Sequence, residues 1–261
     1  MPSPASNLNK RLLALQEHLG VKADGIIGPV SITTLENALD IQPPANTFNL
    51  TVSKISIDAL FRYEISSEAY YTKFLQKPVW PGGDSGVTIG IGYDLGFSTK
   101  DGIIKDWGDF IPEDDLNILV KVAELTGGAA KQALSQVKDI SVPLTAAKNV
   151  FFQITLPQFA KLTKQTYPGT ENLFADAQGV MVSLIYNRGS SLANNDRRKE
   201  MKAIKPLVAA ADYTGIADQL RQMKRLWDPA KAGGLINRRE DEAKMLKNAD
   251  RQYSNEELVR I

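Results

Sequence analysis

Residues 85–96 read Ser-Gly-Val-Thr-Ile-Gly-Ile-Gly-Tyr-Asp-Leu-Gly, and their apolar side chains alternate with small or polar ones, which predicts β structure. A single straight strand would hold Thr88 and Asp94 roughly 20 Å apart. Gly90 and Gly92, however, tolerate the positive φ angles of a tight turn. A hairpin folded between these glycines would pair Thr88 with Asp94 on one face, with Cβ atoms about 5 Å apart. The alternative is an ordinary hairpin in which Asp94 caps a turn and Thr88 only fills a strand position.

A second carboxylate, Glu64, precedes the hairpin in segment 56–74, which has helical periodicity. The apolar residues at the spacing of one helix face are Ile57, Leu60, Phe61 and Ile65. Glu64 continues that stripe, and a carboxylate facing a core is costly unless it is paired, neutral or functional. Burial would raise the pKa of Glu64, as a general acid near neutral pH requires. The alternative is a glutamate at the edge of the stripe that pairs with an arginine.

Two stretches taken together resemble the catalytic signature of phage-type lysozymes, and of their pesticin-like branch in particular. They are residues 61–64 (Phe-Arg-Tyr-Glu) and 86–96. The resemblance implies a muramidase, which hydrolyses the β-1,4 bond between N-acetylmuramic acid and N-acetylglucosamine in peptidoglycan. It also implies that Glu64, Thr88 and Asp94 form the catalytic set, with Glu64 as the general acid.

Two aspartates compete for the role of second carboxylate. Asp94 follows Thr88 by six positions, as in the pesticin-like branch. Ordinary phage lysozymes instead place the aspartate before the threonine, six positions in the commonest arrangement. That position is Gly82 here, and the nearest acid is Asp84. We favour Asp94 and keep Asp84 as the alternative or as a supporting residue.

The resemblance continues through the C-terminal half, so that it covers about residues 55–248. Residues 183–189 (Ser-Leu-Ile-Tyr-Asn-Arg-Gly) resemble the helix and turn beside the lysozyme cleft, which implies a supporting role for Asn187. Residues 234–240 resemble the Asn-Arg helix of these enzymes. This second likeness implies that Arg238 is the partner of the catalytic glutamate. The alternative is that Arg238 and its neighbour Arg239 lie on a solvated helix face.

The N-terminal residues resemble a small peptidoglycan-binding domain of three-helix type. An apolar helical stripe that Gly20 can end consists of Leu8, Leu12, Leu15 and Leu19. Residues 24–29 (Asp-Gly-Ile-Ile-Gly-Pro) contain Asp-Gly and Gly-Pro pairs, which are typical of loops, and Ser31 can cap a second helix. The residues that the resemblance assigns to wall binding are Asp24, Gly25 and Gly28. The alternative is a helical hairpin that only packs on the larger domain.

These patterns predict a mainly α (α+β) fold in three parts. A helical peptidoglycan-binding domain spans residues 1–42, and a linker with two prolines spans 43–54. A lysozyme-like muramidase domain with a small antiparallel β-hairpin spans 55–261. Its further helical patterns cover residues 116–125, 146–152, 156–166, 175–187, 216–227 and 235–247. Trp227 is expected in the core with the apolar residues that precede it at helical spacing.

Composition excludes several other wall-degrading chemistries. The chain has 261 residues, no cysteine and one histidine, His18, which we expect on a helix surface. Zinc amidases need several imidazole or thiolate ligands, and Cys-His or Ser-His-Asp hydrolases need a base that is missing here. A carboxylate-driven glycosidase needs no cofactor, so none is expected. The net charge of +1 predicts no nucleic-acid partner.

Two alternatives to a muramidase stay open at this level. A lytic transglycosylase on the same fold would use one acid/base and form 1,6-anhydro products, and a non-catalytic protein would only bind the cell wall. The N-terminus lacks a signal-peptide pattern, and no apolar run has the length of a membrane span. We expect a monomer made in the bacterial cytoplasm that acts on peptidoglycan without membrane insertion. A phage endolysin released through holin lesions is the first interpretation, and an antibacterial effector delivered by a secretion machine is the second.

Overall fold

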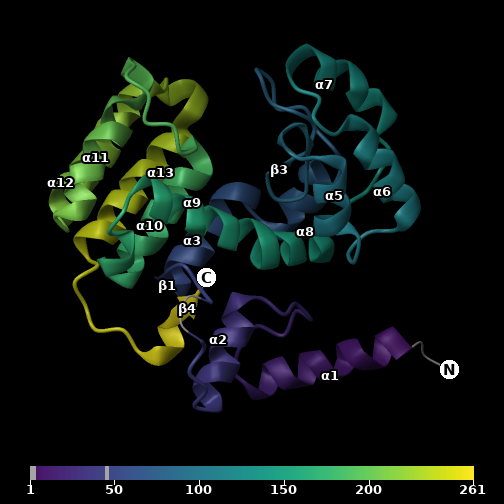
Figure 1. Cartoon of the computed structure of the whole chain (residues 1–261), viewed down its shortest axis with the longest axis horizontal. Coiled ribbons are helices and arrows are strands. Elements are labelled where there is room, and N and C mark those ends of the chain that lie inside the picture. The colour runs from purple at the N-terminus through teal and green to yellow at the C-terminus, as the bar shows by residue number, and fades with distance from the viewer. Residues whose placement is uncertain (1–3, 45–46) are drawn as a thin grey trace. The chain divides into compact units, whose positions relative to one another are not determined.

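The computed structural model describes residues 4–44 and 47–261, with side chains from residue 8 onward (Figure 1). The fold is mainly helical with a small antiparallel hairpin, as the sequence predicts, and this part of the chain also contains a second two-stranded antiparallel sheet that was not predicted. The chain divides into two compact units, and both draw on the N-terminal residues. None of the described helices is both long and apolar enough to cross a bilayer.

The first unit consists of Met1–Leu13, Ala23–Gly28 and Glu64–Thr155. Its elements after Ile65 are α4 (Glu68–Tyr70), a π-helical turn (Tyr71–Leu75), β2 (Thr88–Ile89), β3 (Tyr93–Asp94), a 3-10 turn (Leu95–Phe97), α5 (Lys100–Trp107), α6 (Glu113–Leu119), a 3-10 turn (Val120–Val122), α7 (Gly127–Ala133), a 3-10 turn (Leu134–Gln136), α8 (Leu144–Val150) and a second π-helical turn (Phe151–Thr155). Helix α5 packs against α6 and α8. Its buried Trp107 meets the ring of Tyr93 edge-on, with centroids 5.5 Å apart, so the helix covers the hairpin.

The second unit consists of Ala14–Lys22, Pro29–Tyr63 and Leu156–Ile261. Its elements are the end of α1 (Pro4–His18), α2 (Pro29–Ala38), β1 (Thr51–Ser53), most of α3 (Lys54–Ile65), α9 (Leu156–Thr166), a 3-10 turn (Thr170–Asn172), α10 (Ala175–Arg188), a 3-10 turn (Asp196–Arg198), α11 (Lys199–Ala209), α12 (Tyr213–Gln222), a 3-10 turn (Met223–Leu226), α13 (Pro229–Lys247), a 3-10 turn (Asn255–Glu257) and β4 (Leu258–Arg260). Helix α12 packs against both α11 and α13. Trp227 packs against a buried cluster that includes Ile216, Leu220 and Met223, which confirms its predicted place.

Segment 56–74 is not one helix, although its apolar residues keep helical spacing. Helix α3 ends at Ile65 because Ser66 has a φ of +58°. The next residue, Ser67, begins α4 and accepts a hydrogen bond from the Tyr70 backbone amide at 3.1 Å. This break comes two residues after Glu64, so the predicted acid lies in the last turn of its helix.

The two ends of the second unit meet in one sheet. Strand β1 pairs antiparallel with β4, with Val52 opposite Val259. The end of the predicted linker, 43–54, is therefore part of the fold, and its residues 45 and 46 lie outside the described residues. The polar C-terminal tail had no strand signal of its own, because β4 is only three residues long and depends on a partner more than 200 positions away.

The second N-terminal helix, α2, packs on this sheet. Helix α2 contacts β4, and the Arg260 guanidinium binds the Glu36 carboxylate at 2.9 Å. Gly20 has a φ of +67° just after α1, as predicted for a helix end. The cap prediction for Ser31 is wrong: α2 begins at Pro29, and the buried Ser31 hydroxyl accepts a hydrogen bond from Gln16 at 3.3 Å. Whether residues 1–42 form a separate wall-binding domain stays a prediction.

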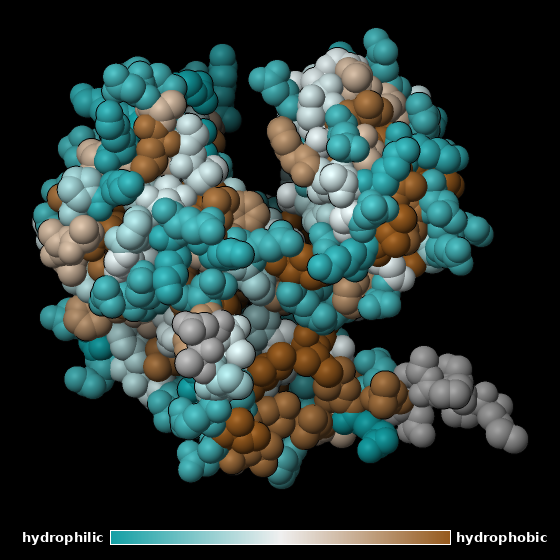
Figure 2. Space-filling model, viewed as in Figure 1, coloured by the Kyte–Doolittle hydropathy of each residue, from teal (hydrophilic) through white to brown (hydrophobic). Residues whose placement is uncertain are grey.

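Part of the predicted leucine stripe is exposed. Leu8 has an exposed fraction of 67%, and Leu15 has one of 41%. Ile32, Leu39 and Ile41 are also at least 47% exposed, and Figure 2 shows hydrophobic surface over α2. His18 is exposed at the end of α1, as expected.

Candidate active site

The predicted hairpin is present with its predicted register. Thr88 lies opposite Asp94 and Ile89 lies opposite Tyr93. Gly90 and Gly92, in the connecting turn, have φ angles of +59° and +69°. Because directly opposed residues point to the same face of a sheet, the hydroxyl of Thr88 and the carboxylate of Asp94 are neighbours.

The Asp94 carboxylate is held by backbone amides. Its Oδ1 accepts hydrogen bonds from the amides of Gly86 at 3.0 Å and Gly96 at 2.8 Å. Its Oδ2 accepts from the Gly86 amide alone, at 3.1 Å. Asp94 therefore caps the turn Leu95–Phe97, as in the ordinary-hairpin alternative, and this capping fixes the orientation of the carboxylate.

The glycines around this carboxylate leave no room for a side chain. A Cβ at Gly86 would lie 2.3 Å from both Asp94 Oδ1 and the Gly96 backbone nitrogen. A Cβ at Gly96 would lie 2.5 Å from the Leu125 carbonyl oxygen. The backbone segments at Gly86 and Gly96 can thus lie close to the Asp94 carboxylate because neither residue has a side chain.

Thr88 is fixed by its backbone. Its amide donates to the Val79 carbonyl at 2.7 Å, and its own carbonyl accepts from the Val79 amide at 3.0 Å. The side chain is half-buried, and no hydrogen bond to the Thr88 hydroxyl is found in the described part of the chain. The hydroxyl is therefore left for water or a ligand beside Asp94.

Glu64 belongs to the same compact unit as Thr88 and Asp94. Its side chain is half-buried in the last turn of α3, where the apolar face of this helix ends before Ser66. On that stripe, Ile57, Leu60 and Ile65 are at most 3% exposed. The helix face that Glu64 continues is thus buried, as the periodicity predicts.

Asp84, the alternative second carboxylate, is exposed. It lies in a turn with Gly82 and Gly83, whose φ angles are +103° and +60°. The Ser85 amide closes this turn on the Gly82 carbonyl at 3.3 Å. Among the described residues, no backbone amide donates a hydrogen bond to the Asp84 carboxylate, and Asp84 has no partner residue in a strand. Asp94, in contrast, accepts hydrogen bonds from backbone amides and pairs with Thr88.

The alternative of a solvated helix face for Arg238 and Arg239 is wrong. Their side chains are 3% and 0% exposed, and both guanidinium groups bind the Glu242 carboxylate, at 3.3 Å and 2.7 Å. Arg238 also donates to the Ser183 hydroxyl at 2.9 Å and to the Ser183 carbonyl at 3.0 Å. Its guanidinium lies 4.9 Å from the ring centroid of Tyr63. Whether Arg238 is the partner of Glu64 stays a prediction.

Sequence analysis missed Glu242, which accepts hydrogen bonds from both arginines and from Ser183. Its spacing of four residues from Arg238 and three from Arg239 was the available signal, because such pairs share a helix face. This spacing was not decisive, because the residues belong to a charged run whose composition also fits a solvent-exposed helix face.

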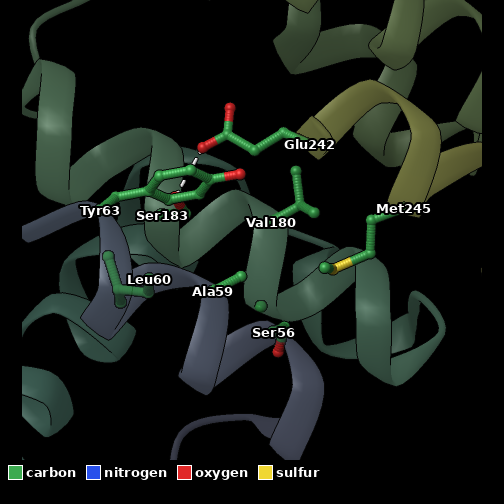
Figure 3. A pocket seen from close by; sticks show the side chains of 9 residues that line it. Ser56, Ala59, Leu60, Tyr63, Val180, Ser183, Glu242 and Met245 are labelled. Carbon is green, nitrogen blue, oxygen red and sulfur yellow. Dashed lines mark hydrogen bonds between the residues drawn. The ribbon is translucent and has the colours of Figure 1, made fainter. Parts of the chain in front are cut away.

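A small cavity borders this network, as Figure 3 shows. It is lined by α3, α10 and α13 side chains, including Tyr63, Ser183 and Glu242, and its volume is about 10 Å³. A cavity of this volume holds about one water molecule and is too small for a sugar ring. Among the described residues, no group of three or more His, Asp and Glu side chains is arranged to hold a metal ion.

The remaining predicted site residues lie on α10 and in the N-terminal loop. Asn187 is half-buried near the end of α10, and its buried Oδ1 has no hydrogen-bond partner within the described chain. In the N-terminal loop, Asp24 accepts a hydrogen bond from the Ile26 amide at 3.1 Å, and Gly25 has a φ of +74°. A Cβ at Gly28 would lie 3.1 Å from the Phe152 Cβ. Wall binding by Asp24, Gly25 and Gly28 stays a prediction.

The fold and site define a mainly α-helical protein with a glycine-turned hairpin that presents a threonine and an aspartate. The chain belongs to the family described as a domain of unknown function (DUF8812), whose model matches residues 60–232. The match includes Glu64, Thr88, Asp94 and Asn187 and ends before Arg238. No curated protein matches the chain.

Gly86→Ala should destabilise the protein by at least about 2 kcal/mol, because overpacking beside fixed backbone forces the hairpin apart. Gly128→Ala is the matched control, since a Cβ there meets nothing within 4 Å. It should leave stability unchanged or raise it by up to about 1 kcal/mol. Urea unfolding measures both variants, and equal stability of the two would contradict the tight packing around Asp94.

Glu242→Gln should lower the free energy of unfolding by about 3–5 kcal/mol, because two buried guanidinium groups lose their counter-charge. Glu240→Gln, two positions away on the same helix, should change the midpoint of thermal unfolding little. Glu240 pairs with Arg221 and Lys224 at the surface, where solvent screens the pair. A similar midpoint for both variants would show that the buried network is not a stabilising unit.

Proposed function

We propose that the protein is a muramidase, a glycoside hydrolase that cleaves the β-1,4 bond between N-acetylmuramic acid and N-acetylglucosamine in peptidoglycan. The observation that carries the proposal is the register pairing of Thr88 with Asp94, in the same compact unit as Glu64. The likeness of these residues to the pesticin-like lysozymes supports it. A lysozyme-like fold is part of the same proposal.

In the proposed mechanism, Glu64 donates a proton to the glycosidic oxygen as the bond breaks. The resulting positive charge on the oxocarbenium-like sugar is stabilised by the Asp94 carboxylate. The amides of Gly86 and Gly96 hold this carboxylate in place, so it does not have to reorient during the reaction. The adjacent Thr88 hydroxyl orients a water whose oxygen bonds to the anomeric carbon, and a carboxylate of the site, Asp94 or the deprotonated Glu64, accepts the proton that this water releases. The roles that the resemblance gives to Arg238 and Asn187 stay predictions and are not used in this mechanism.

Glu64→Gln should reduce release of wall fragments by several orders of magnitude, because the amide cannot supply the proton. The measurement is mass spectrometry of purified peptidoglycan after digestion and borohydride reduction. Fragments that end in reduced N-acetylmuramic acid, absent with the variant, would support the muramidase. Anhydro-muramic ends would reassign the protein as a lytic transglycosylase. No fragments from folded wild type would leave only a wall-binding protein.

Asp94→Asn should lower wall lysis by at least about 100-fold, since the neutral amide no longer stabilises positive charge. Asp84→Asn is the matched comparison and should retain most of the activity. Thr88→Ala should lose less activity than Glu64→Gln, because another group can still reach the water. Circular dichroism checks folding, since Asp94 also caps a turn. A larger loss for Asp84→Asn than for Asp94→Asn would move the second carboxylate to Asp84.

A further inference from the structure

The second unit has an open cavity of about 330 Å³ before and along the start of α11. It is lined by Ala193, Asn194, Asn195, Asp196, Lys199 and Lys202. This volume is in the range of small-molecule sites and fits a sugar or amino-acid residue. The lining is polar, with two side-chain amides and two ammonium groups.

The cavity has a surplus of positive charge. Its one acid, Asp196, is bound to Arg225, with Nη1 2.8 Å from Oδ2. The same arginine binds the buried Glu200 at 2.6 Å, so it occupies both nearby carboxylates. Lys199 has no ion pair with a described carboxylate, and the Lys202 ammonium contacts only the Asn194 amide oxygen, at 3.4 Å.

The chain beside the cavity adds further cations. Arg188 donates to the Arg197 carbonyl at 2.7 Å, and Arg198 donates to the Arg188 carbonyl. None of these three guanidinium groups pairs with a carboxylate in the described chain. The pKa of Arg188 is lowered to about 10, mainly because burial disfavours the charged form, with smaller contributions from the nearby charges of Arg198 and Arg197.

The cavity wall is held in shape without a ligand. Arg225 donates to the Asp196 carbonyl at 2.6 Å as well as to its carboxylate. The Asn195 amide donates to Ala193 at 2.9 Å, and the Arg198 amide donates to Asn195 at 3.1 Å. A polar site that is built before the ligand arrives loses less entropy on binding.

We propose that this cavity binds free carboxylate groups of the peptide attached to N-acetylmuramic acid. The proposal rests on the proposed function, because peptidoglycan is the substrate that carries such peptides. Lys199 and Lys202 supply the counter-charge, while Asn194 and Asn195 supply donors and acceptors for the peptide amides. The site would make the enzyme prefer glycan with its peptides over bare glycan.

The test measures binding by isothermal titration calorimetry with the full-length wild type. The probe is N-acetylglucosaminyl-N-acetylmuramyl-L-alanyl-D-glutamate with free carboxylates, and its partner is the same compound with every carboxylate amidated. This disaccharide lacks the bond that the proposed reaction cleaves. Wild type should bind the free form at least about tenfold more tightly, as expected for charge-assisted contacts.

The double variant Lys199→Gln/Lys202→Gln should remove that tenfold preference and leave binding of the amidated probe unchanged. Lys205→Gln, an exposed lysine on α11 outside the cavity lining, is the matched control and should retain the preference. Equal binding of the two probes by wild type, or an unchanged preference in the double variant, would overturn the proposal.

The two proposals fail in different ways. Digestion of peptidoglycan by a protein that does not distinguish the probes would leave the muramidase and overturn the carboxylate site. A preference for the free probe that the double variant loses, without any release of fragments from peptidoglycan, would overturn the muramidase and leave a carboxylate-binding protein.

Discussion

The close approach of two backbone segments around one carboxylate organises the first unit. Gly86 and Gly96 lack a Cβ, and their amides reach the same Asp94 oxygen. Since Asp94 lies opposite Thr88, the contact that caps the turn also sets the side chains proposed for catalysis. Capping does not exhaust the carboxylate, because Oδ2 shares a single donor with Oδ1 and keeps acceptor capacity for water or substrate.

The second unit solves a different problem, the burial of like charges between helices. Arg238 and Arg239 are both buried on α13, and one carboxylate, Glu242, binds both of them. The Ser183 hydroxyl on α10 donates to the same carboxylate and ties the two helices together. Desolvation makes such a group a weak source of net stability, but it strongly penalises any packing that separates its members. The network therefore specifies how α10 and α13 meet.

Local patterns in the sequence predicted the parts that depend on neighbours in the chain. The hairpin register followed from period-two alternation and two glycines, and helix 156–166 was predicted with the bounds that α9 has. Helices α5 and α11 were missed, since α5 contains a glycine, Gly102, and α11 an internal proline, Pro206. Strand β4 was missed because its partner is remote in sequence. Burial of charge was missed because a charged run looks the same on a surface and in a paired core.

The pairing of charges also separates a structural cluster from a candidate binding site. Arginine and lysine side chains gather near the start of α11 as they do on α13, but only on α13 does every buried cation share a carboxylate. Near α11, Arg225 binds both Asp196 and Glu200, and Lys199 and Lys202 make no ion pair of their own within the described chain. These two ammonium groups are exposed and solvated, so the stability of the fold does not depend on a partner for them. The peptide carboxylate proposed above would add a counter-charge to this cluster, whereas on α13 Glu242 already supplies one.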